Sequence, residues 1–502
     1  MARYRNIDNV RAAFDKLKQT WADTLGKLQA RTPDPDFNTC FNTWNQYQST
    51  MTTFLSRSIS PYEWGIGRGV GFRDTSQDLM GMTHAWPEYV RRMLVTLMSV
   101  LWKDGAATHN FFPLTGEGQE RDFNDDHLWL ILSACHYVKE TGDTALLEES
   151  ILFKDAPPAS AFEHLDRAID RSWNLVGRHG LPQIGHADWN DGLNNPGDVT
   201  SESVFVAMLF CQTCREMAEL CDHLGRSTDA VRYREYHRAM KERTNSHAWD
   251  GQWYRRILHT RGGYGGGMGT ELGYIFVEPQ PWAVISGVAD GARAETAMAS
   301  VHEHLLTDFG IAILKEAFPR YDPDIGSISI VLPGIKENGS VFCHCNPWVI
   351  VAETVLGHGD RAMEYYKLTS YTTVNRRADV HQADPYVYSQ HICLPPHKHP
   401  GRAGNPWLTG SAGWFMQTMS HYILGIRPTY SGLRLDPCVP RAWKNWTVER
   451  TFRGARYRIR FENPAGVSKG VRRVTVDGKE IEGNVVSVFP AGTEHAVRVI
   501  MG

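Results

Sequence analysis

Two aspartates stand three residues apart in the segment HADWNDGLN, with a tryptophan between them. Asp188 and Asp191 belong to a turn rich in Gly and Asn, and Trp189 separates them. Burial beside an indole raises the pKa of a carboxyl group by desolvation, which is the environment that a general acid needs. The alternative is an Asx-rich turn that caps the next helix. The spacing alone favours neither interpretation.

A second candidate segment is GIGRGVGFRDTSQD, which carries Arg68, Arg73 and Asp74 among glycines, with Arg57 upstream in LSRS. No GK[ST] follows the glycines, so the segment is not a P-loop. An Arg/Asp pair on a glycine-supported loop can bind several sugar hydroxyls through charge-assisted hydrogen bonds. A structural salt bridge is the simpler interpretation of an Arg-Asp dipeptide taken alone.

Two predicted helix starts could bind an anion. In FCHCNPWVIVAETVL, Asn346 is a suitable N-cap and Pro347 a suitable first helical residue, which places His344 just ahead of the positive helix end. In WLTGSAGWFMQTM, Thr409 and Gly410 offer a hydroxyl and an open N–H at another start. Such donors at helix N-termini suit phosphate above all. The pair becomes informative only if the two starts converge.

Three further polar residues are weaker candidates. Lys336 and Glu337 lie in PGIKENG, a few residues before His344, and Gln390 lies in YVYSQH. A solvated charged turn is the default interpretation of the first two, and Gln390 is unremarkable by itself.

The elements that must position these residues are mostly helices. From about Phe37 to Thr429, apolar residues recur at intervals of three and four, as in amphipathic or buried helices. The predicted helices span 87–102, 125–140, 161–176, 202–221, 229–243, 292–306, 346–356 and 412–424. The turns ETGDTA, LGRSTDA, GVADGARA and LGHGDRA repeat one pattern, which indicates a closed toroid of helix pairs.

The two ends of the chain differ from this helical body. Asn9 to Gln29 is charged and amphipathic, so residues 1–36 are predicted to form a linker helix before a main domain at 37–428. Beyond Ile426, short runs alternate at period two between Gly, Pro and Asn. Residues 429–502 are therefore predicted to form a small antiparallel β domain.

Composition excludes several classes of function. The 502 residues are 42% hydrophobic and 22% charged with a net charge of -3, and no basic stripe supports nucleic-acid binding. No run approaches about 18 apolar residues and no signal-peptide core is present, so we expect a cytoplasmic protein without a membrane anchor. The nine cysteines are scattered, which predicts reduced thiols and no structural metal.

Taken together, these segments resemble the inverting disaccharide phosphorylases of glycoside hydrolase family 94. The resemblance rests on blocks that occur in the family's order from about residue 40 to the C-terminus. They are WNQYQSTMTTFLSRS, GIGRGVGFRDTSQDLMG, FNDDHLWL, HADWNDGLN, PQPWAVISG, PGIKENGSVFCHCNPWVIVAE, WLTGSAGW and LRLDPCVP. Eight ordered blocks are far more specific than any single motif.

The resemblance implies a mainly α fold, an (α/α)6 barrel followed by a small β domain, and assigns roles to the candidates. Asp191 would be the general acid, and His344, Thr409 and Gly410 would bind phosphate. The sugar-binding residues would be Arg57, Arg68, Arg73, Asp74, Trp189, Lys336, Glu337 and Gln390. No cofactor is implied, because inorganic phosphate is the co-substrate.

The implied reaction is inverting phosphorolysis of a β-linked, gluco-configured disaccharide or short oligosaccharide. A hydrolase needs a second carboxylate to activate water, whereas phosphate is itself the nucleophile and gives an α-sugar 1-phosphate. Two alternatives stay open. One is an inverting hydrolase on the same barrel with Glu316, Asp322 or Asp324 as the base, and the other is a truncated, non-catalytic sugar-binding domain.

The family also carries a large N-terminal β-sandwich ahead of the linker helix, and this chain begins at or just before that helix. The resemblance therefore implies either a homodimer or a partner that supplies the β-sandwich.

Overall fold

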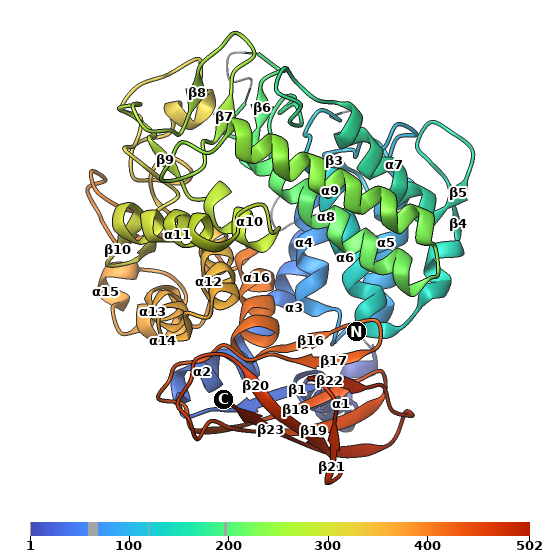
Figure 1. The fold of residues 1–502 in the computed structure, drawn as a ribbon. Coiled ribbons are helices and arrows are strands. Elements are labelled where there is room, and N and C mark those ends of the chain that lie inside the picture. The colour runs from blue at the N-terminus through green and yellow to red at the C-terminus, as the bar shows by residue number, and fades with distance from the viewer. Residues whose placement is uncertain (1, 59–68, 119, 195–197) are drawn as a thin grey trace.

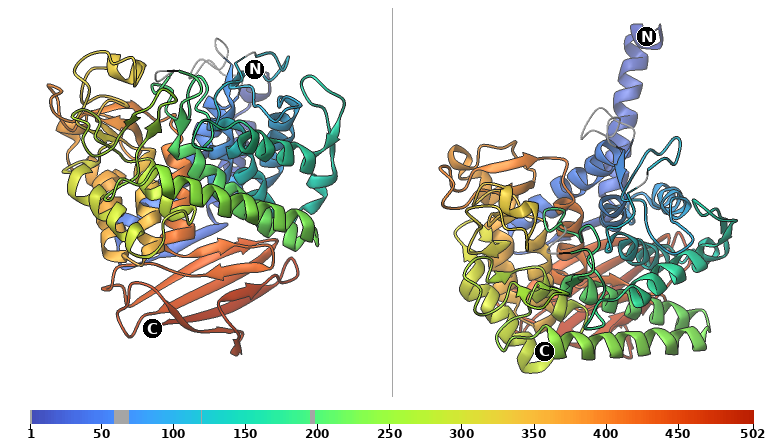
Figure 2. Two further views of the ribbon diagram at one scale, coloured as in Figure 1. Left: turned by 45° about the horizontal axis from the view of Figure 1, so that its top comes forward. Right: turned by 90° about the horizontal axis from the view of Figure 1, so that it is seen from above.

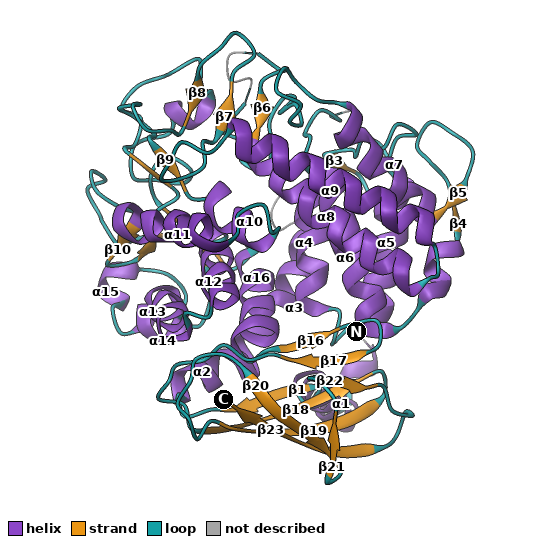
Figure 3. Cartoon of the chain, viewed as in Figure 1, coloured by secondary structure: helices purple, strands orange, loops and turns teal. Residues whose placement is uncertain are grey.

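The computed structural model describes residues 2–58, 69–118, 120–194 and 198–502. The body of the molecule is helical and the C-terminal region forms β-sheet, as Figures 1 and 3 show. This confirms the prediction of a mainly α protein followed by a separate β region.

The helices are α1 (Ile7–Leu25), α2 (Pro35–Thr39), α3 (Asn45–Ser56), α4 (Phe72–Met82), α5 (Pro87–Ser99), α6 (Asp126–Thr141), α7 (Ala161–Asn174), α8 (Val204–His223), α9 (Ser227–His247), α10 (Pro279–Ile285), α11 (Gly291–Leu305), α12 (Cys345–Leu356), α13 (Gly359–Thr369), α14 (Tyr371–Asn375), α15 (Ala378–His381) and α16 (Ser411–Gln417).

Every helical range predicted from apolar spacing contains a helix, namely α5, α6, α7, α8, α9, α11, α12 and α16. The last range, 412–424, consists of α16 and a π-helical segment, Thr418–Ile423, that continues it. The boundaries differ by a few residues, because helix ends are fixed by local capping rather than by the apolar pattern.

Within the described residues, α4, α6, α8, α10, α12 and α16 contact one another in a closed ring. The helices α5, α7, α9, α11 and α13 pack against this ring from outside, and α3 packs against α4 and α16. The sequences explain the division. Helix α6 is rich in apolar residues and almost wholly buried, whereas α9 buries only the stripe Ala230, Tyr233, Met240 and Thr244.

The C-terminal region contains two sheets. One has the strand order β1-β18-β19-β23-β20-β21 and the other the order β16-β17-β22. Their strands are β1 (Leu28–Arg31), β16 (Ile426–Pro428), β17 (Gly432–Leu435), β18 (Asn445–Phe452), β19 (Ala455–Glu462), β20 (Val471–Val476), β21 (Lys479–Ile481), β22 (Val485–Ser487) and β23 (Glu494–Met501).

Two details of this region differ from the sequence-based expectation. The sheet is not antiparallel throughout, since β19 and β23 run parallel with Arg456 opposite Glu494. The segment predicted as a linker helix also contributes the edge strand β1, which pairs with β18 so that Leu28 lies opposite Arg450. A period-two pattern shows that a strand exists but not which strand it pairs with.

Short strands connect the helices, and three of them form a sheet that matters for the site. Strand β13 (Val341–Phe342) pairs with β14 (Ser389–Ile392), which pairs with β15 (Ala403–Pro406). The others are β2 (Val70–Gly71), β3 (Asn110–Phe111), β4 (Ser150–Ile151), β5 (Ala159–Ser160), β6 (Glu202–Ser203), β7 (Ile257–Leu258), β8 (Tyr264–Gly265), β9 (Ile275–Phe276), β10 (Leu306–Thr307), β11 (Gly310–Ile311) and β12 (Leu314–Lys315).

Helix α1 projects from the body of the molecule, as the right-hand view of Figure 2 shows. Its free part exposes the apolar side chains of Ile7, Val10, Phe14 and Leu17, while Trp21 packs against the Tyr47 ring at 5.0 Å. Among the described residues, no helix is long and apolar enough to cross a membrane, and no cluster of His, Cys, Asp or Glu has metal-binding geometry. The nine cysteines are buried and free.

Candidate active site

Residues from segments far apart in the chain line one pocket of about 370 Å³ on the helical body. We call it the site pocket. Its size falls within the usual range for small-ligand sites. It is lined by all the predicted site residues that the structure describes: Arg57, Arg73, Asp74, Trp189, Asp191, Lys336, Glu337, Gln390, His344, Thr409 and Gly410. The remaining candidate, Arg68, lies outside the described residues.

The small sheet β13-β14-β15 brings the two predicted anion-binding helix starts together. Strand β13 leads to His344 at the start of α12, and β15 leads to Thr409 and Gly410 at the start of α16. Strand β14 lies between them, and its Gln390 carbonyl accepts a hydrogen bond from the N–H of Cys343 at 2.8 Å. The convergence that the sequence left open is therefore present.

The start of α12 differs in detail from the predicted cap. Helix α12 begins at Cys345, with His344 at the N-cap position, and Asn346 does not cap it. The Asn346 side chain instead accepts a hydrogen bond from the N–H of Ile311 at 2.8 Å and thus ties α12 to β11. At α16, Gly410 is at the N-cap position.

The two aspartates of DWND have different environments. The buried Asp188 carboxylate accepts hydrogen bonds from Arg256 Nη1 and Nη2 at 2.6 and 2.7 Å and from Ser203 Oγ at 2.6 Å. Burial alone would raise the pKa of Asp188, but Arg256 and Ser203 hold it below its ordinary value. The N–H of Asn190 also donates to Asp188 at 3.0 Å. This hydrogen bond forms an Asx turn, as the alternative interpretation of the motif predicted.

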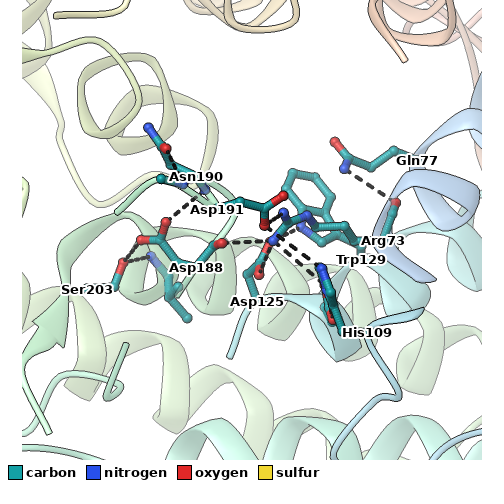
Figure 4. A network of polar contacts seen from close by, with 12 residues as sticks. Arg73, Gln77, His109, Asp125, Trp129, Asp188, Asn190, Asp191 and Ser203 are labelled. Carbon is teal, nitrogen blue, oxygen red and sulfur yellow. Dashed lines mark hydrogen bonds and ion pairs between the residues drawn. The ribbon is translucent and has the colours of Figure 1, made fainter. Parts of the chain in front are cut away.

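Asp191, in contrast, points into the site pocket, and its side chain is 62% exposed. The expected burial of this carboxyl beside an indole is absent, because Trp189 packs against Trp348 and His344. Its nearest cationic partner is Arg73, whose Nη2 donates to Asp191 Oδ1 (Figure 4). Asp188 thus holds the loop, and Asp191 is the carboxyl free to meet a ligand.

The Arg73 guanidinium donates hydrogen bonds to several acceptors besides Asp191, and these hold it in place next to Asp191. Its Nη1 donates to Asp125 Oδ1 at 3.0 Å and to the Asp188 carbonyl at 2.8 Å (Figure 4). Burial, with the charges of Asp126 and Asp188, raises the pKa of Asp125 to about 7 against the opposing effect of Arg73.

Sequence reasoning did not single out Asp125, Asp126 or His109 as site residues. His109 Nδ1 lies 2.9 Å from Asp126 Oδ2, and its Nε2 lies 4.0 Å from Asp191 Oδ1. Two adjacent carboxylates directly before the apolar run of a predicted helix, in FNDDHLWL, are a signal that could have found the acidic pair. Nothing local to His109 indicates that it lies near Asp191.

The end of the pocket near α16 contains a tightly packed group of ion pairs. Arg57 Nε donates to Asp78 at 2.8 Å, and its Nη1 lies 3.7 Å from Asp74. Burial alone would raise the pKa of Asp74, but Arg57 and Arg73 lower it to about 2. A Cβ added to Gly410 would lie 2.9 Å from the His344 ring and 3.1 Å from Asp78, so only glycine fits there.

The carboxylates named as bases for a hydrolase lie elsewhere. Among the described residues that line the site pocket, Glu316, Asp322 and Asp324 are absent. Asp324 pairs with Arg261, and Glu316 lines a different cavity. Apart from Asp191, the side-chain carboxylates in the pocket are Asp74 and Glu337, and burial raises the pKa of Glu337.

Comparison with known proteins identifies the family. The family model described as "Glycosyl hydrolase 94 superfamily, catalytic domain" matches residues 20–425. An N,N'-diacetylchitobiose phosphorylase of Vibrio proteolyticus is 36% identical, with 99% of this chain covering 65% of that protein. A solabiose phosphorylase of Paenibacillus borealis is 30% identical, with 94% of this chain covering 60% of that protein. The chain thus spans slightly less than two thirds of the length of these relatives.

A solved structure supports the architecture alone. A GH78 family rhamnosidase of Bacillus sp. GL1 superposes with a TM-score of 0.61 at 12% identity, over 95% of this chain and 44% of that one. The motifs, the pocket that collects them and the family match agree, and the chain belongs to the glycosyl hydrolase 94 superfamily.

Proposed function

We propose that this protein catalyses inverting phosphorolysis of a β-linked, gluco-configured disaccharide or short oligosaccharide, and the reverse synthesis. In this proposal the closed ring of helices with its outer layer is an (α/α)6 barrel, and the site pocket is its active site. The observation that carries the proposal is that Asp191 and two helix starts with anion-binding donors line one pocket.

Asp191 would protonate the glycosidic oxygen while phosphate, bound by His344, Thr409 and Gly410, attacks the anomeric carbon from the opposite face. Binding both reactants in one pocket supplies proximity, and the donors at the helix ends stabilise the anion. Arg73 donates a hydrogen bond to Asp191. Since Arg73 is also bound by Asp125 and the Asp188 carbonyl, it stays in place when Asp191 is protonated and this contact weakens.

Hydrolysis would need a base for water. Asp74 is a poor base because its pKa is about 2, whereas burial raises the pKa of Glu337. Among the described carboxylates of the pocket other than Asp191, Glu337 is therefore the one that would have to activate water. Relatives named for N,N'-diacetylchitobiose, solabiose and 3-O-β-D-glucopyranosyl-β-D-glucuronide are all phosphorylases, which supports the same reaction type here. No cofactor takes part in the proposed reaction, since phosphate is the co-substrate.

The experiment is to incubate the protein with cellobiose, chitobiose and laminaribiose, with and without phosphate, and to follow the products by ³¹P and ¹H NMR. We expect an α-sugar 1-phosphate to form from at least one sugar and only with phosphate. Sugar release at the same rate without phosphate would replace the proposal by hydrolysis. Saturable sugar binding without any turnover would replace it by a non-catalytic sugar-binding role.

A further inference from the structure

The two ring nitrogens of His344 have different surroundings. Nε2 lies 2.9 Å from Gln77 Oε1, and the indole Nε1 of Trp414 lies 2.8 Å from the same oxygen. An indole N–H can only donate, so Gln77 must present its oxygen at this point. The amide nitrogen of Gln77 accordingly donates to the Arg73 carbonyl at 3.3 Å (Figure 4). His344 Nε2 therefore carries a hydrogen.

The other nitrogen, Nδ1, lies beside Gly410. A Cβ at Gly410 would approach Nδ1 to 3.1 Å, and the glycine leaves this side of the ring open where His344 and Gly410 line the site pocket. When Nε2 bears the hydrogen of a neutral imidazole, Nδ1 is a hydrogen-bond acceptor.

The surroundings of the ring keep it neutral. The charged groups around it are Asp74 and Arg73 of α4 and Arg57 at the end of α3, with Asp78 of α4 beside Gly410. The rings of Trp189, Trp348 and Trp414 cover its other sides. Burial, with Arg57 and Arg73, lowers the pKa of His344 to about 3, although Asp74 acts in the opposite direction.

A neutral acceptor is an unusual group to place in an anion site, because it repels the lone pairs of a bare oxyanion. We propose that His344 Nδ1 accepts a hydrogen bond from a P–OH group, so that the pocket selects an oxyanion that carries a proton. This inference rests on the proposed function, in which the pocket binds phosphate. At neutral pH inorganic phosphate carries at least one P–OH, whereas sulfate carries no S–OH.

The assignment also orients the nucleophile. The P–OH oxygen is held against His344, so an ionised phosphate oxygen forms the new bond to the anomeric carbon. The bond between that carbon and the glycosidic oxygen breaks, and the leaving oxygen takes the proton from Asp191. The sugar 1-phosphate keeps its P–OH, and His344 neither gains nor loses a proton.

The test compares phosphate and sulfate binding by calorimetry between about pH 6 and 8, with phosphate expressed as HPO₄²⁻. Sulfate has no proton to donate, so it can form a hydrogen bond with Nδ1 only if His344 takes up a proton. We therefore expect the Kd of sulfate to rise by up to about tenfold per pH unit. Binding heats that depend on the buffer would report the same proton uptake. The Kd of hydrogen phosphate should stay nearly constant.

Two outcomes would contradict the inference. One concerns His344 alone, and the other also contradicts the proposed phosphate site. A sulfate Kd that does not change with pH, without proton uptake, overturns the role of His344 but leaves the phosphate site intact. If neither anion binds, the proposed phosphate site fails and the inference fails with it.

Two variants sharpen the test. Gln77→Glu keeps an oxygen for both His344 Nε2 and Trp414 but adds a negative charge that stabilises the imidazolium. We expect sulfate binding at pH 8 to tighten by about tenfold or more, relative to phosphate. His344→Gln removes the titrating group, so the pH dependence of sulfate binding should vanish. A purely structural role of Gln77 would instead weaken both anions equally at every pH.

Discussion

The loop between α7 and α8 uses two aspartates of one motif in different ways. Asp188 is fully buried, and its charge is balanced by Arg256, which also lies 3.6 Å from Glu278. The Asp191 side chain is exposed in the site pocket, where it contacts the buried side chain of Arg73. One carboxylate therefore contributes to folding, and the other is available for chemistry.

This difference predicts opposite effects of the same substitution. Asp188→Asn leaves the buried Arg256 charge incompletely balanced, so we expect a loss of about 3 kcal/mol or more in the free energy of unfolding. Asp191→Asn should leave that free energy unchanged and lower kcat for phosphorolysis by about 10²- to 10⁴-fold, because the proton donor is lost. Urea unfolding and product formation measure the two effects. Turnover retained in Asp191→Asn would remove it from the acid role.

Two histidines inside the helical body make the fold sensitive to acid. Burial, with Lys139, holds the pKa of His136 at about 3, and burial with His136 holds that of His421 far below its ordinary value. Both residues line one cavity of the helical ring, His136 from α6 and His421 from the π-helical segment that follows α16, with their rings 5.3 Å apart. In the unfolded chain both would take up protons near pH 6.5.

Stability should therefore be full above about pH 6.5 and fall as the pH decreases toward these low pKa values. Each such histidine contributes up to about 1.4 kcal/mol per pH unit. Urea unfolding between about pH 5 and 7.5 measures the slope. His136→Gln should reduce it by one such contribution, whereas His399→Gln, at an exposed position, should not change it. An unchanged slope in His136→Gln would contradict the assignment.

The family motifs, rather than residue types and spacing alone, assigned the eleven predicted residues that line the site pocket. They did not predict Gln77 as a site residue, although it lies one helical turn after Asp74 on α4. Its importance comes from two partners, His344 and Trp414, that are remote in sequence. Gln77 meets these two partners only because α4 packs next to the start of α12 and against α16.

At the scale of elements, long helices were predictable and the short strands around the site were not. The helix α6 shows apolar residues over four turns, whereas β13 has two residues and β14 and β15 have four each. A strand so short offers too few alternations to be recognised. The sheet that joins the two anion-binding helix starts is therefore known only from the structure.

The position of these helix starts also depends on a close contact between α4 and α16. A Cβ on Gly81 of α4 would lie 2.6 Å from the Gly413 Cα, a backbone atom that cannot turn aside. A Cβ on Gly413 would meet Asp78 at 3.4 Å or more, which is ordinary contact. Both glycines lie at the contact between α4 and α16, but a side chain fits at Gly413 and does not fit at Gly81.

Gly81→Ala should therefore push α16 away from α4. We expect it to lower the free energy of unfolding by about 1–3 kcal/mol and to raise the KM for phosphate, since α16 carries Thr409 and Gly410. Gly413→Ala is the matched control, and its higher helix propensity should leave stability unchanged or raise it by up to about 1 kcal/mol. Equal losses in both variants, from denaturant unfolding, would show that helix separation is not the cause.

At the scale of the whole molecule, the separate C-terminal β region was predictable but its connection to the rest was not. The alternating runs after residue 426 show strands, yet the pairing of β19 with β23 and the addition of β1 depend on contacts between distant segments. The N-terminal segment thereby completes a sheet formed by the C-terminal region. Such long-range pairing leaves no mark in a local pattern.

A buried ion pair joins the helical ring to this sheet. Glu140, at the end of α6, accepts a hydrogen bond from Arg450 of β18, and both side chains are almost fully buried. Arg450 lies opposite Leu28 of β1, so the pair sits where the helical body, the sheet and the N-terminal strand meet. Removing one partner leaves the other charge buried without compensation, which typically costs about 3–5 kcal/mol.

A double-mutant cycle measures this connection. Arg450→Met and Glu140→Gln should each lower the free energy of unfolding, Arg450→Met by about 3–5 kcal/mol, and the double variant should lose clearly less than their sum. The exposed pair Arg456 and Glu449 on the same sheet is the control, and its cycle should give less than about 1 kcal/mol. Strict additivity at Glu140 and Arg450 would mean that the pair does not couple the two regions. In that case apolar packing alone would hold the sheet against the helices, because the buried apolar side chains of both regions form one continuous cluster.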